Sequence, residues 1–480
     1  MQHSSEELNA SARSGRPATL GDLKASGHLY RTVKQEIREN LLTRMRAGQN
    51  RFPGIVGFDQ TVLPHMERAL LAGHDIILLG ERGQGKTRLI RTLGELLDEW
   101  TPVITGCEIN DHPYAPACAR CRRLAAELGD QLPVSWRHKS ERYGEKLATP
   151  DTSVGDLIGD VDPIKVAQGR TLGDPETIHF GLVPRTNRGI LAVNELPDLA
   201  ERIQVALLNV LEERDIQVRG YQLRMPLDLL LVASANPEDY TNRGRIITPL
   251  KDRFGAEVRT HYPLALEDEL GLIAQEAAVL WSDAAHAAPV VPAHLLEVVA
   301  RFARDVRDAP QVDQRSGVSA RFSIAGAETV AAAALHRATV QGEDEAVARM
   351  VDLEAASETL KGKVEFETGE EGREDEILLH LLRTATAETV RHHFRGLDFS
   401  LLVDRIEAGQ MVTTGEQVTA RDFLTGLPVL GESELYDEVC ERLEATNDGQ
   451  RAGAIELALE GLYLARKISK ESGGGETVYG

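Results

Sequence analysis

The sequence is poor in cysteine and has no long apolar run. Four cysteines in 480 residues are too few for a disulfide scaffold. No apolar stretch approaches the roughly 20 residues that a membrane-spanning helix needs. The first residues also lack the basic and apolar stretches of a signal peptide. These absences predict a cytoplasmic protein without a membrane span.

Basic residues are scarce relative to acidic ones. The chain has 54 Lys and Arg against 75 Asp and Glu, a net charge of -21. Proteins that bind nucleic acid neutralise its phosphates with clustered Lys and Arg, so a general nucleic-acid partner is not expected. The length is sufficient for two or three domains. The sequence shows no internal repeat of the kind that solenoid proteins have.

A phosphate-binding loop is the clearest motif. Residues 80–87 fit the pattern G-x-x-x-x-G-K-[ST] at every fixed position. The apolar run 75–79 before the loop predicts a buried strand, and the spacing of apolar residues over 88–97 predicts a helix. Backbone amides and a helix N-terminus bind phosphate in this arrangement. The predicted nucleotide-binding residues are Gly80, Glu81, Arg82, Gly83, Gln84, Gly85, Lys86 and Thr87.

Two of these residues have specific roles in phosphate loops. Lys86 is expected to reach the β- and γ-phosphates, and Thr87 to ligate Mg²⁺. The sequence therefore predicts binding of ATP with Mg²⁺.

Two further apolar runs end in polar residues. Residues 189–193 predict a strand that leads into Asn194 and Glu195, and residues 227–233 predict another that leads to Asn236. The carboxyl ends of parallel strands line the ligand crevice of such sheets. We expect Glu195 to position the attacking water and Asn236 to contact the γ-phosphate or that water.

Strands and helices alternate from residue 55 to 262. Additional strands are predicted at 102–105 and 257–261, which indicates an α/β fold with a parallel sheet covered on both faces. Composition divides the whole chain into five segments. They are a mobile segment and helix (1–50), a nucleotide-binding core (51–262), a helical lid (263–340), an acidic linker (341–376) and a C-terminal helical region (377–480).

With these motifs in order, residues 52–335 resemble AAA+ ATPases of the magnesium-chelatase I-subunit branch, which is related to MoxR. The resemblance includes an adenine-packing segment with Val56 and Gly57 and the Walker A loop. It continues through a helix-2 insertion (152–173), the approach to Walker B (181–191), a pre-sensor hairpin (212–220), sensor 1 (Asn236), an arginine-finger motif (252–254) and sensor 2 (319–321).

The resemblance implies an AAA+ P-loop αβα sandwich followed by an α-helical lid, and it implies roles for two arginines. Arg253 would reach a neighbouring subunit's γ-phosphate, and Arg321 would close the lid on the nucleotide. Arg243 and Arg245 are rival candidates for the arginine supplied by a neighbour. An arginine supplied in this way requires a homo-oligomer, and the expected assembly is a hexameric ring.

Asn194 stands where Walker B usually has Asp. Its carbonyl oxygen can still hold Mg²⁺ through a water, but a full negative charge is lost beside the cation. We expect weaker organisation of Mg²⁺ and slower turnover. The alternative is a nucleotide-gated scaffold that hardly hydrolyses ATP.

The resemblance favours an ATP-hydrolysing remodelling motor that works with a von Willebrand A-type partner. That partner would be a separate chain, because the sequence has no D-x-S-x-S motif. One alternative is a genuine magnesium-chelatase ATPase subunit in tetrapyrrole synthesis. Another is a sigma-54-type transcription activator, although the sequence lacks the G-A-F-T-G-A loop and a helix-turn-helix pattern.

A cysteine cluster is a second chemical signal. Cys107, Cys118 and Cys121 have the spacing C-x₁₀-C-x₂-C, with His112 inside the span. Three thiolates and one imidazole can form a closed tetrahedral Zn²⁺ site. His138 is an alternative fourth ligand, and three free thiols are the alternative to a metal site. Cys440 lies in a helical pattern and is expected in the core.

Overall fold

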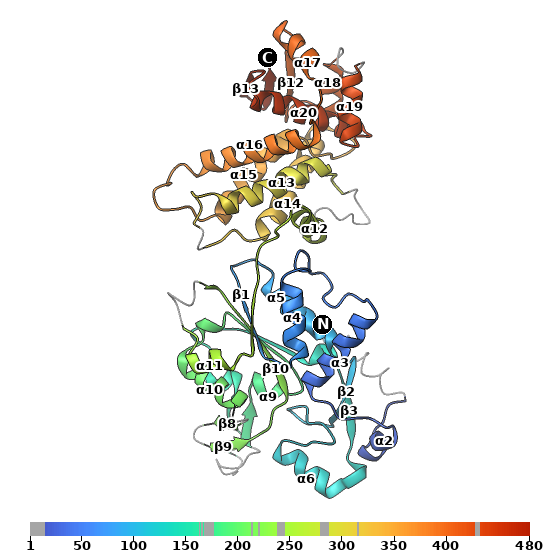
Figure 1. Cartoon of the computed structure of the whole chain (residues 1–480), viewed down its shortest axis with the longest axis vertical. Coiled ribbons are helices and arrows are strands. Elements are labelled where there is room, and N and C mark those ends of the chain that lie inside the picture. The colour runs from blue at the N-terminus through green and yellow to red at the C-terminus, as the bar shows by residue number, and fades with distance from the viewer. Residues whose placement is uncertain are drawn as a thin grey trace. The chain divides into compact units, whose positions relative to one another are not determined.

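The computed structural model describes residues 15–162, 164, 167, 177–212, 215–218, 221–237, 245–278, 288–313, 316–427 and 433–480. The chain folds into two compact units (Figure 1). The first comprises Met1–Gly80 and Gly85–His261, and the second Glu81–Gln84 and Tyr262–Gly480. Every helix that the structure describes is too short or too polar to cross a bilayer.

The first unit contains a five-stranded parallel sheet, which confirms the predicted fold class. Its strand order is β11-β1-β10-β7-β4. The strands are β1 (Ile76–Leu79), β4 (Tyr143–Leu147), β7 (Gly189–Asn194), β10 (Leu229–Ala235) and β11 (Ala256–Arg259). The sequence did not predict β4, because this edge strand is only half buried and has no apolar run.

Helices cover both faces of this sheet (Figure 1). Successive residues of a strand point to opposite faces, so Ile76 and Leu78 belong to one core and Ile77 and Leu79 to the other. The first core contains side chains of α3 (Val33–Arg46), α4 (Val62–Leu71) and α5 (Lys86–Thr92). The second contains side chains of α7 (Val154–Leu157), α9 (Leu182–Arg185), α10 (Glu201–Glu212) and α11 (Thr248–Arg253).

A small lobe is inserted between α5 and β4. The predicted strand 102–105 is part of β2 (Trp100–Ile104), which pairs antiparallel with β3 (Val134–His138) and not with the main sheet. Helix α6 (Ala119–Leu128) lies between these strands in the chain. We call residues 15–25 and 100–138 the small lobe.

The N-terminal part of the small lobe differs from the predicted mobile segment. Residues 20–25 form helix α2 (Leu20–Ala25), and the backbone N–H of Leu20 donates to the carbonyl of Leu132 at 2.9 Å. Leu20 and Leu132 share a small apolar cluster with Ile104 and Cys121.

Two short hairpins complete the first unit. Strand β5 (Gly159–Val161) pairs with β6 (Ile178–Phe180). The first strand lies inside the predicted helix-2 insertion and the second follows it. Strand β8 (Asp215–Val218) pairs with β9 (Tyr221–Arg224) at the predicted pre-sensor hairpin. Much of the predicted insertion and the hairpin residues 213–214 and 219–220 lie outside the described residues.

The second unit begins with five helices around one apolar core. They are α12 (Leu266–Glu276), α13 (Ala293–Asp308), α14 (Arg321–Gln341), α15 (Met350–Leu360) and α16 (Glu374–His393). Helix α15 lies inside the predicted acidic linker. Its acids Glu354 and Glu358 are exposed, whereas Leu353 and Leu360 are buried in the core. Acids of the predicted linker therefore lie on the solvated face of α15 and in the turns of residues 364–373 before α16.

The C-terminal part of this unit packs around a second core. It contains α17 (Ser400–Glu407), α18 (Ala420–Thr425), α19 (Glu434–Arg442) and α20 (Asp448–Leu464). A three-stranded sheet has the order β12-β14-β13, formed by β12 (Val412–Gly415), β14 (Glu476–Tyr479) and β13 (Lys470–Gly473). The end of the predicted C-terminal helical region is thus a β-hairpin that turns at Gly474 and Gly475.

Arg349 connects the two cores of the second unit. This residue immediately precedes α15, and its side chain is completely buried. Its guanidinium donates to Glu456 of α20, to Thr414 of β12 at 2.8 Å and to the carbonyl of Val418 at 2.7 Å. A buried charge is tolerated only when it is paired and hydrogen-bonded, which these acceptors provide.

Candidate functional site

Two of the predicted catalytic residues, Glu195 and Asn236, lie at the carboxyl edge of the main sheet. In the strand pairing, Leu79 at the end of β1 is opposite Ala235 of β10, and Val193 of β7 is opposite Ala233. The residues that follow these three strands therefore emerge at the same edge. Ligands of open α/β sheets bind at this edge.

The phosphate loop leads directly into α5. Gly83 and Gly85 both have φ of 74°, a conformation that glycine adopts without steric cost. Lys86 is the first residue of α5, and its side chain is buried. Its ammonium donates to the carbonyl of Gly80 and to Oδ1 of Asn236, the latter at 2.8 Å.

Asn236 connects this lysine to the predicted catalytic acid. While Oδ1 of Asn236 accepts from Lys86, its Nδ2 donates to Oε2 of Glu195 at 2.9 Å. Glu195 has φ of 56°, an uncommon conformation for a residue other than glycine. Such backbone strain often occurs at functional sites. The three side chains form one continuous hydrogen-bonded series.

Asn194 makes hydrogen bonds with both ends of its amide. Its Oδ1 accepts from the hydroxyls of Ser234 at 3.1 Å and Thr87 at 3.4 Å. Its Nδ2 donates to Oε1 of Glu145 at 2.8 Å. An aspartate at this position could not donate, so the amide makes a contact that the usual Walker B carboxylate cannot make.

Glu145 is a site residue that the sequence reasoning missed. It lies on the edge strand β4, where Arg91 of α5 donates to both carboxylate oxygens at 2.9 Å. These hydrogen bonds hold the pKa of Glu145 below its usual value. The hydroxyl of Tyr143 also donates to Oε2 at 3.1 Å. Glu145 thus places a negative charge next to Asn194, where the sequence indicated only a neutral residue.

The remaining predicted nucleotide-site residues lie in several places. Val56 and Gly57 are in the partly buried segment between α3 and α4. Arg253 is the last residue of α11 and is exposed, as is Arg245. Arg321 is the exposed first residue of α14, in the second unit. Arg243 lies outside the described residues.

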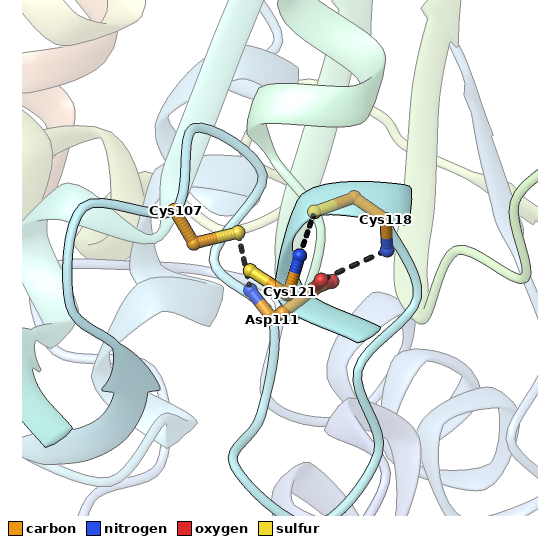
Figure 2. Close-up of side chains that lie close together, drawn as sticks. All are labelled: Cys107, Asp111, Cys118 and Cys121. Atoms are coloured by element: carbon orange, nitrogen blue, oxygen red, sulfur yellow. Dashed lines mark hydrogen bonds between the residues drawn. The ribbon is translucent and has the colours of Figure 1, made fainter. Parts of the chain in front are cut away.

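The predicted cysteine cluster forms, with a different fourth member (Figure 2). The potential ligand atoms of Cys107, Asp111, Cys118 and Cys121 all lie within 4.8 Å of one another. Hydrogen bonds from Cys118 and Cys121 lower the pKa of Cys107 to about 4, and burial raises the pKa of Asp111 to about 7.

The two histidines predicted as ligands are outside this cluster. Nδ1 of His112 accepts from the backbone N–H of Tyr114 at 3.0 Å, and its Nε2 lies 3.2 Å from Nε2 of His28. Burial lowers the pKa of His112 to about 2, so the ring is neutral. His138 contacts Ser140 and the ring of Trp100. Asp111 replaces His112 as the fourth member.

Several known proteins are similar to parts of this chain. The family model of the sigma-54 interaction domain matches residues 170–253. Magnesium-chelatase subunit ChlI of Anabaena variabilis is 30% identical over 190 residues, which cover 39% of this chain and 52% of the relative. The magnesium-chelatase 38 kDa subunit of Cereibacter sphaeroides is 29% identical over 231 residues, covering 46% of this chain and 62% of the relative.

A solved structure of the complex between subunits BchI and BchD of magnesium chelatase also matches. It covers 68% of this chain and 98% of the matched chain, with 22% identity and a TM-score of 0.35. The chain spans about half the length of the curated relatives it matches first.

The sheet order, the phosphate loop and the polar residues at the strand ends define an AAA+ P-loop protein. Within this class, less than half of the chain is similar to magnesium-chelatase I subunits, at about 30% identity.

Proposed function

We propose that this protein is a Mg²⁺-dependent ATPase that acts as a ring-shaped, MoxR-like remodelling motor in the cytoplasm. The observation that carries the proposal is the hydrogen-bonded series of Lys86, Asn236 and Glu195 at the carboxyl edge of the sheet. In this series, Asn236 links Lys86, which would bind phosphate, to Glu195, which would act as the catalytic acid. A bound γ-phosphate could contact Asn236 and so change the position of Glu195.

The residues at this edge fit ATP and Mg²⁺. The ammonium of Lys86 is buried at the end of the phosphate loop, where a phosphate would form a charge-assisted hydrogen bond with it. The oxygens of Thr87 and Asn194, which are adjacent, are of the type that Mg²⁺ prefers, directly or through water. Glu195 would orient water, and Asn236 would hold Glu195 in place.

Glu145 supports hydrolysis over a nucleotide-gated scaffold. Its carboxylate supplies a negative charge beside Asn194, so the loss of the Walker B aspartate is partly offset. Arg91 holds this carboxylate in its ionised form. We therefore favour an active but slow enzyme.

The ring and the partner extend the proposal to the whole assembly. Arg253 is exposed at the end of α11, where a neighbouring subunit could receive it. A separate von Willebrand A-type protein would couple the motor to its client. The relationship to magnesium-chelatase subunits keeps a genuine chelatase motor as the second candidate.

Two substitutions in the full-length protein test the proposed ATPase. Lys86→Ala should weaken ATP binding by about 10-fold or more, because a hydrogen bond to a charged group contributes about 1.5–3 kcal/mol. Glu195→Gln should retain ATP binding and reduce hydrolysis by about 100-fold or more, the scale of general acid–base losses. Binding is measured by calorimetry and turnover by phosphate release.

The exposed Lys467→Ala provides the matched control and should behave like the unmodified protein. Hydrolysis by Glu195→Gln at the unmodified rate would refute the assignment of the catalytic acid. Unmodified ATP affinity in Lys86→Ala would refute the nucleotide site itself.

A further inference from the structure

The cysteine cluster lies where the small lobe meets the rest of the first unit. Cys107 follows β2, and Cys118 and Cys121 are at the start of α6 (Figure 2). Cys121 packs with Leu20 and Leu132 inside the lobe, whereas Cys107 and Cys118 also contact the core beneath the main sheet. The cluster therefore lies between these two apolar cores.

Backbone amides already point at the sulfur atoms. The N–H of Asp111 donates to Sγ of Cys107 at 3.3 Å, and the N–H of Cys121 donates to Sγ of Cys118 at 3.3 Å. Such donors stabilise thiolates and orient them around a metal ion. They arise from two tight turns, the first with Asn110 at φ of 57° and the second at the N-terminus of α6.

Asp111 supplies the observation that points most directly to a ligand. Its side chain is completely buried, and Oδ2 accepts from the N–H of Cys118 at 2.9 Å. Its other oxygen, Oδ1, is buried without a hydrogen-bond partner among the described residues. A buried carboxylate oxygen without a partner is energetically unfavourable unless a proton or a cation satisfies it.

We propose that Cys107, Asp111, Cys118 and Cys121 bind one structural zinc ion. Tetrahedral zinc with Zn–S bonds of about 2.3 Å places its ligands about 3.8 Å apart. The four ligand atoms, which already lie within 4.8 Å of one another, need only a small contraction. Thiolate and carboxylate are both established zinc ligands, and four protein ligands leave no open position for catalysis.

The surroundings are consistent with a site of net negative charge. Three thiolates and one carboxylate around Zn²⁺ leave two excess negative charges. The guanidinium of Arg120 lies against Gly106, next to Cys107, where it offsets part of that excess. Softer thiolate ligands also favour zinc over Mg²⁺ and Ca²⁺, which prefer oxygen.

The metal would stabilise the loop that attaches the small lobe to β7. Asn110, inside the loop, donates to the carbonyl of Arg185, and the carbonyl of Ile109 accepts from Asn187 at 2.9 Å. Asn187 lies two residues before β7, the strand that ends in Asn194 and Glu195. The zinc ion would thus keep the loop in the conformation that makes these contacts.

Elemental analysis of the full-length untagged protein tests the site. We expect about one zinc per chain, reduced to below about one tenth in Cys118→Ser. The serine hydroxyl can still accept the hydrogen bond from the N–H of Cys121, so helix α6 keeps its cap while the thiolate is lost. Removal of zinc by a chelator should lower the melting temperature by about 5 °C or more without changing ATP binding.

Two pairs of variants distinguish this ligand set from the alternatives. Asp111→Ala should lose zinc, whereas the neighbouring His112→Gln should keep it. Cys440→Ser, which removes the buried cysteine of the second unit, should keep it as well. Co²⁺ added to the metal-free protein should give the intense thiolate absorption of a tetrahedral site, and Cys118→Ser should not.

Several outcomes would overturn the proposal. They are zinc well below half an equivalent with all four thiols open to titration, iron in place of zinc, or zinc that depends on His112 and not on Asp111. Because ATP binding is measured in parallel, failure of the zinc site is distinguishable from failure of the proposed ATPase.

Discussion

At the scale of single residues, the most consequential position is Asn194. The structure gives this asparagine a hydrogen bond to Glu145 that an aspartate would replace with repulsion between two carboxylates. Two unit charges about 4 Å apart near a protein surface interact by about 4 kcal/mol before screening. The positive charge of Arg91, which donates to both oxygens of the ionised Glu145, offsets part of this repulsion.

Asn194→Asp should therefore lower thermal stability in Mg²⁺-free buffer and lower the Mg²⁺ concentration needed for half-maximal activity. Both effects have one cause: the cation relieves the repulsion between two acids. Turnover should rise, because the site gains a carboxylate beside the metal. Thermal melting and steady-state kinetics at varied Mg²⁺ measure these changes.

The double variant Asn194→Asp/Glu145→Gln is the matched control. It keeps the hydrogen bond between the two positions but reverses it, because the amide now donates from position 145 and the carboxylate accepts at position 194. It should recover the stability that the single variant loses. Slower turnover in Asn194→Asp would show that the amide contact serves catalysis and that Asn194 does not slow the enzyme.

The sequence predicted the central nucleotide-site residues because each follows an apolar run. It could not predict Glu145, whose strand is half exposed and has no apolar run. It also chose His112 over Asp111. Which of two adjacent side chains faces the thiols depends on the left-handed turn at Asn110, and spacing alone does not reveal that turn.

At the scale of secondary-structure elements, a buried ion pair attaches the unpredicted strand β4 to α3. Arg142, just before β4, donates to both carboxylate oxygens of Glu36 at 2.7 Å, and both side chains are buried. Its Nε donates to the carbonyl of Arg188 at 2.8 Å, just before β7. This arginine therefore fixes the edge strand that carries Glu145.

Arg142→Met should lower the free energy of unfolding of the first unit by about 3–5 kcal/mol, because it leaves the buried carboxylate of Glu36 without its cationic partner. Arg142→Met/Glu36→Leu should recover much of that loss. Urea denaturation followed by tryptophan fluorescence measures both values. Lys24→Ala, which removes an exposed ion pair with Asp130, should change stability by less than about 1 kcal/mol. Equal losses in the Arg142 and Lys24 variants would contradict the structural role of the buried pair.

The elements differ in how well they could be predicted. The central strands were found because burial on both faces makes them continuously apolar. Helix α15 was missed because its exposed acids dominated the composition, although its buried residues recur at helical spacing. The final hairpin was missed because its strands are short and polar, on either side of the tight turn at Gly474 and Gly475.

At the scale of the whole molecule, the proposed ring predicts complementation between two inactive variants. Arg253→Ala should keep ATP binding and lose about 10³-fold or more in hydrolysis, the scale of arginine-finger losses. When it is mixed with Glu195→Gln, some interfaces should combine an intact Glu195 with an intact Arg253. The mixture should then hydrolyse ATP faster than either variant alone.

Arg245→Ala, mixed with Glu195→Gln in the same way, tests the rival arginine. The exposed Arg259→Ala is the control and should leave activity unchanged. If mixed rings form and no mixing ratio restores activity, the active site is not shared between subunits through Arg253.

The buried position of Arg349 limits where recombination between related genes can divide this chain. The guanidinium and its acceptors Thr414, Val418 and Glu456 come from opposite sides of the junction between the two cores of the second unit. Recombination that replaced the C-terminal part with one lacking these acceptors would leave the guanidinium buried and unpaired, at a cost of about 3–5 kcal/mol out of a domain stability of about 5–15 kcal/mol. The helices from α12 to α16 and the C-terminal part should therefore pass between lineages as a single cassette.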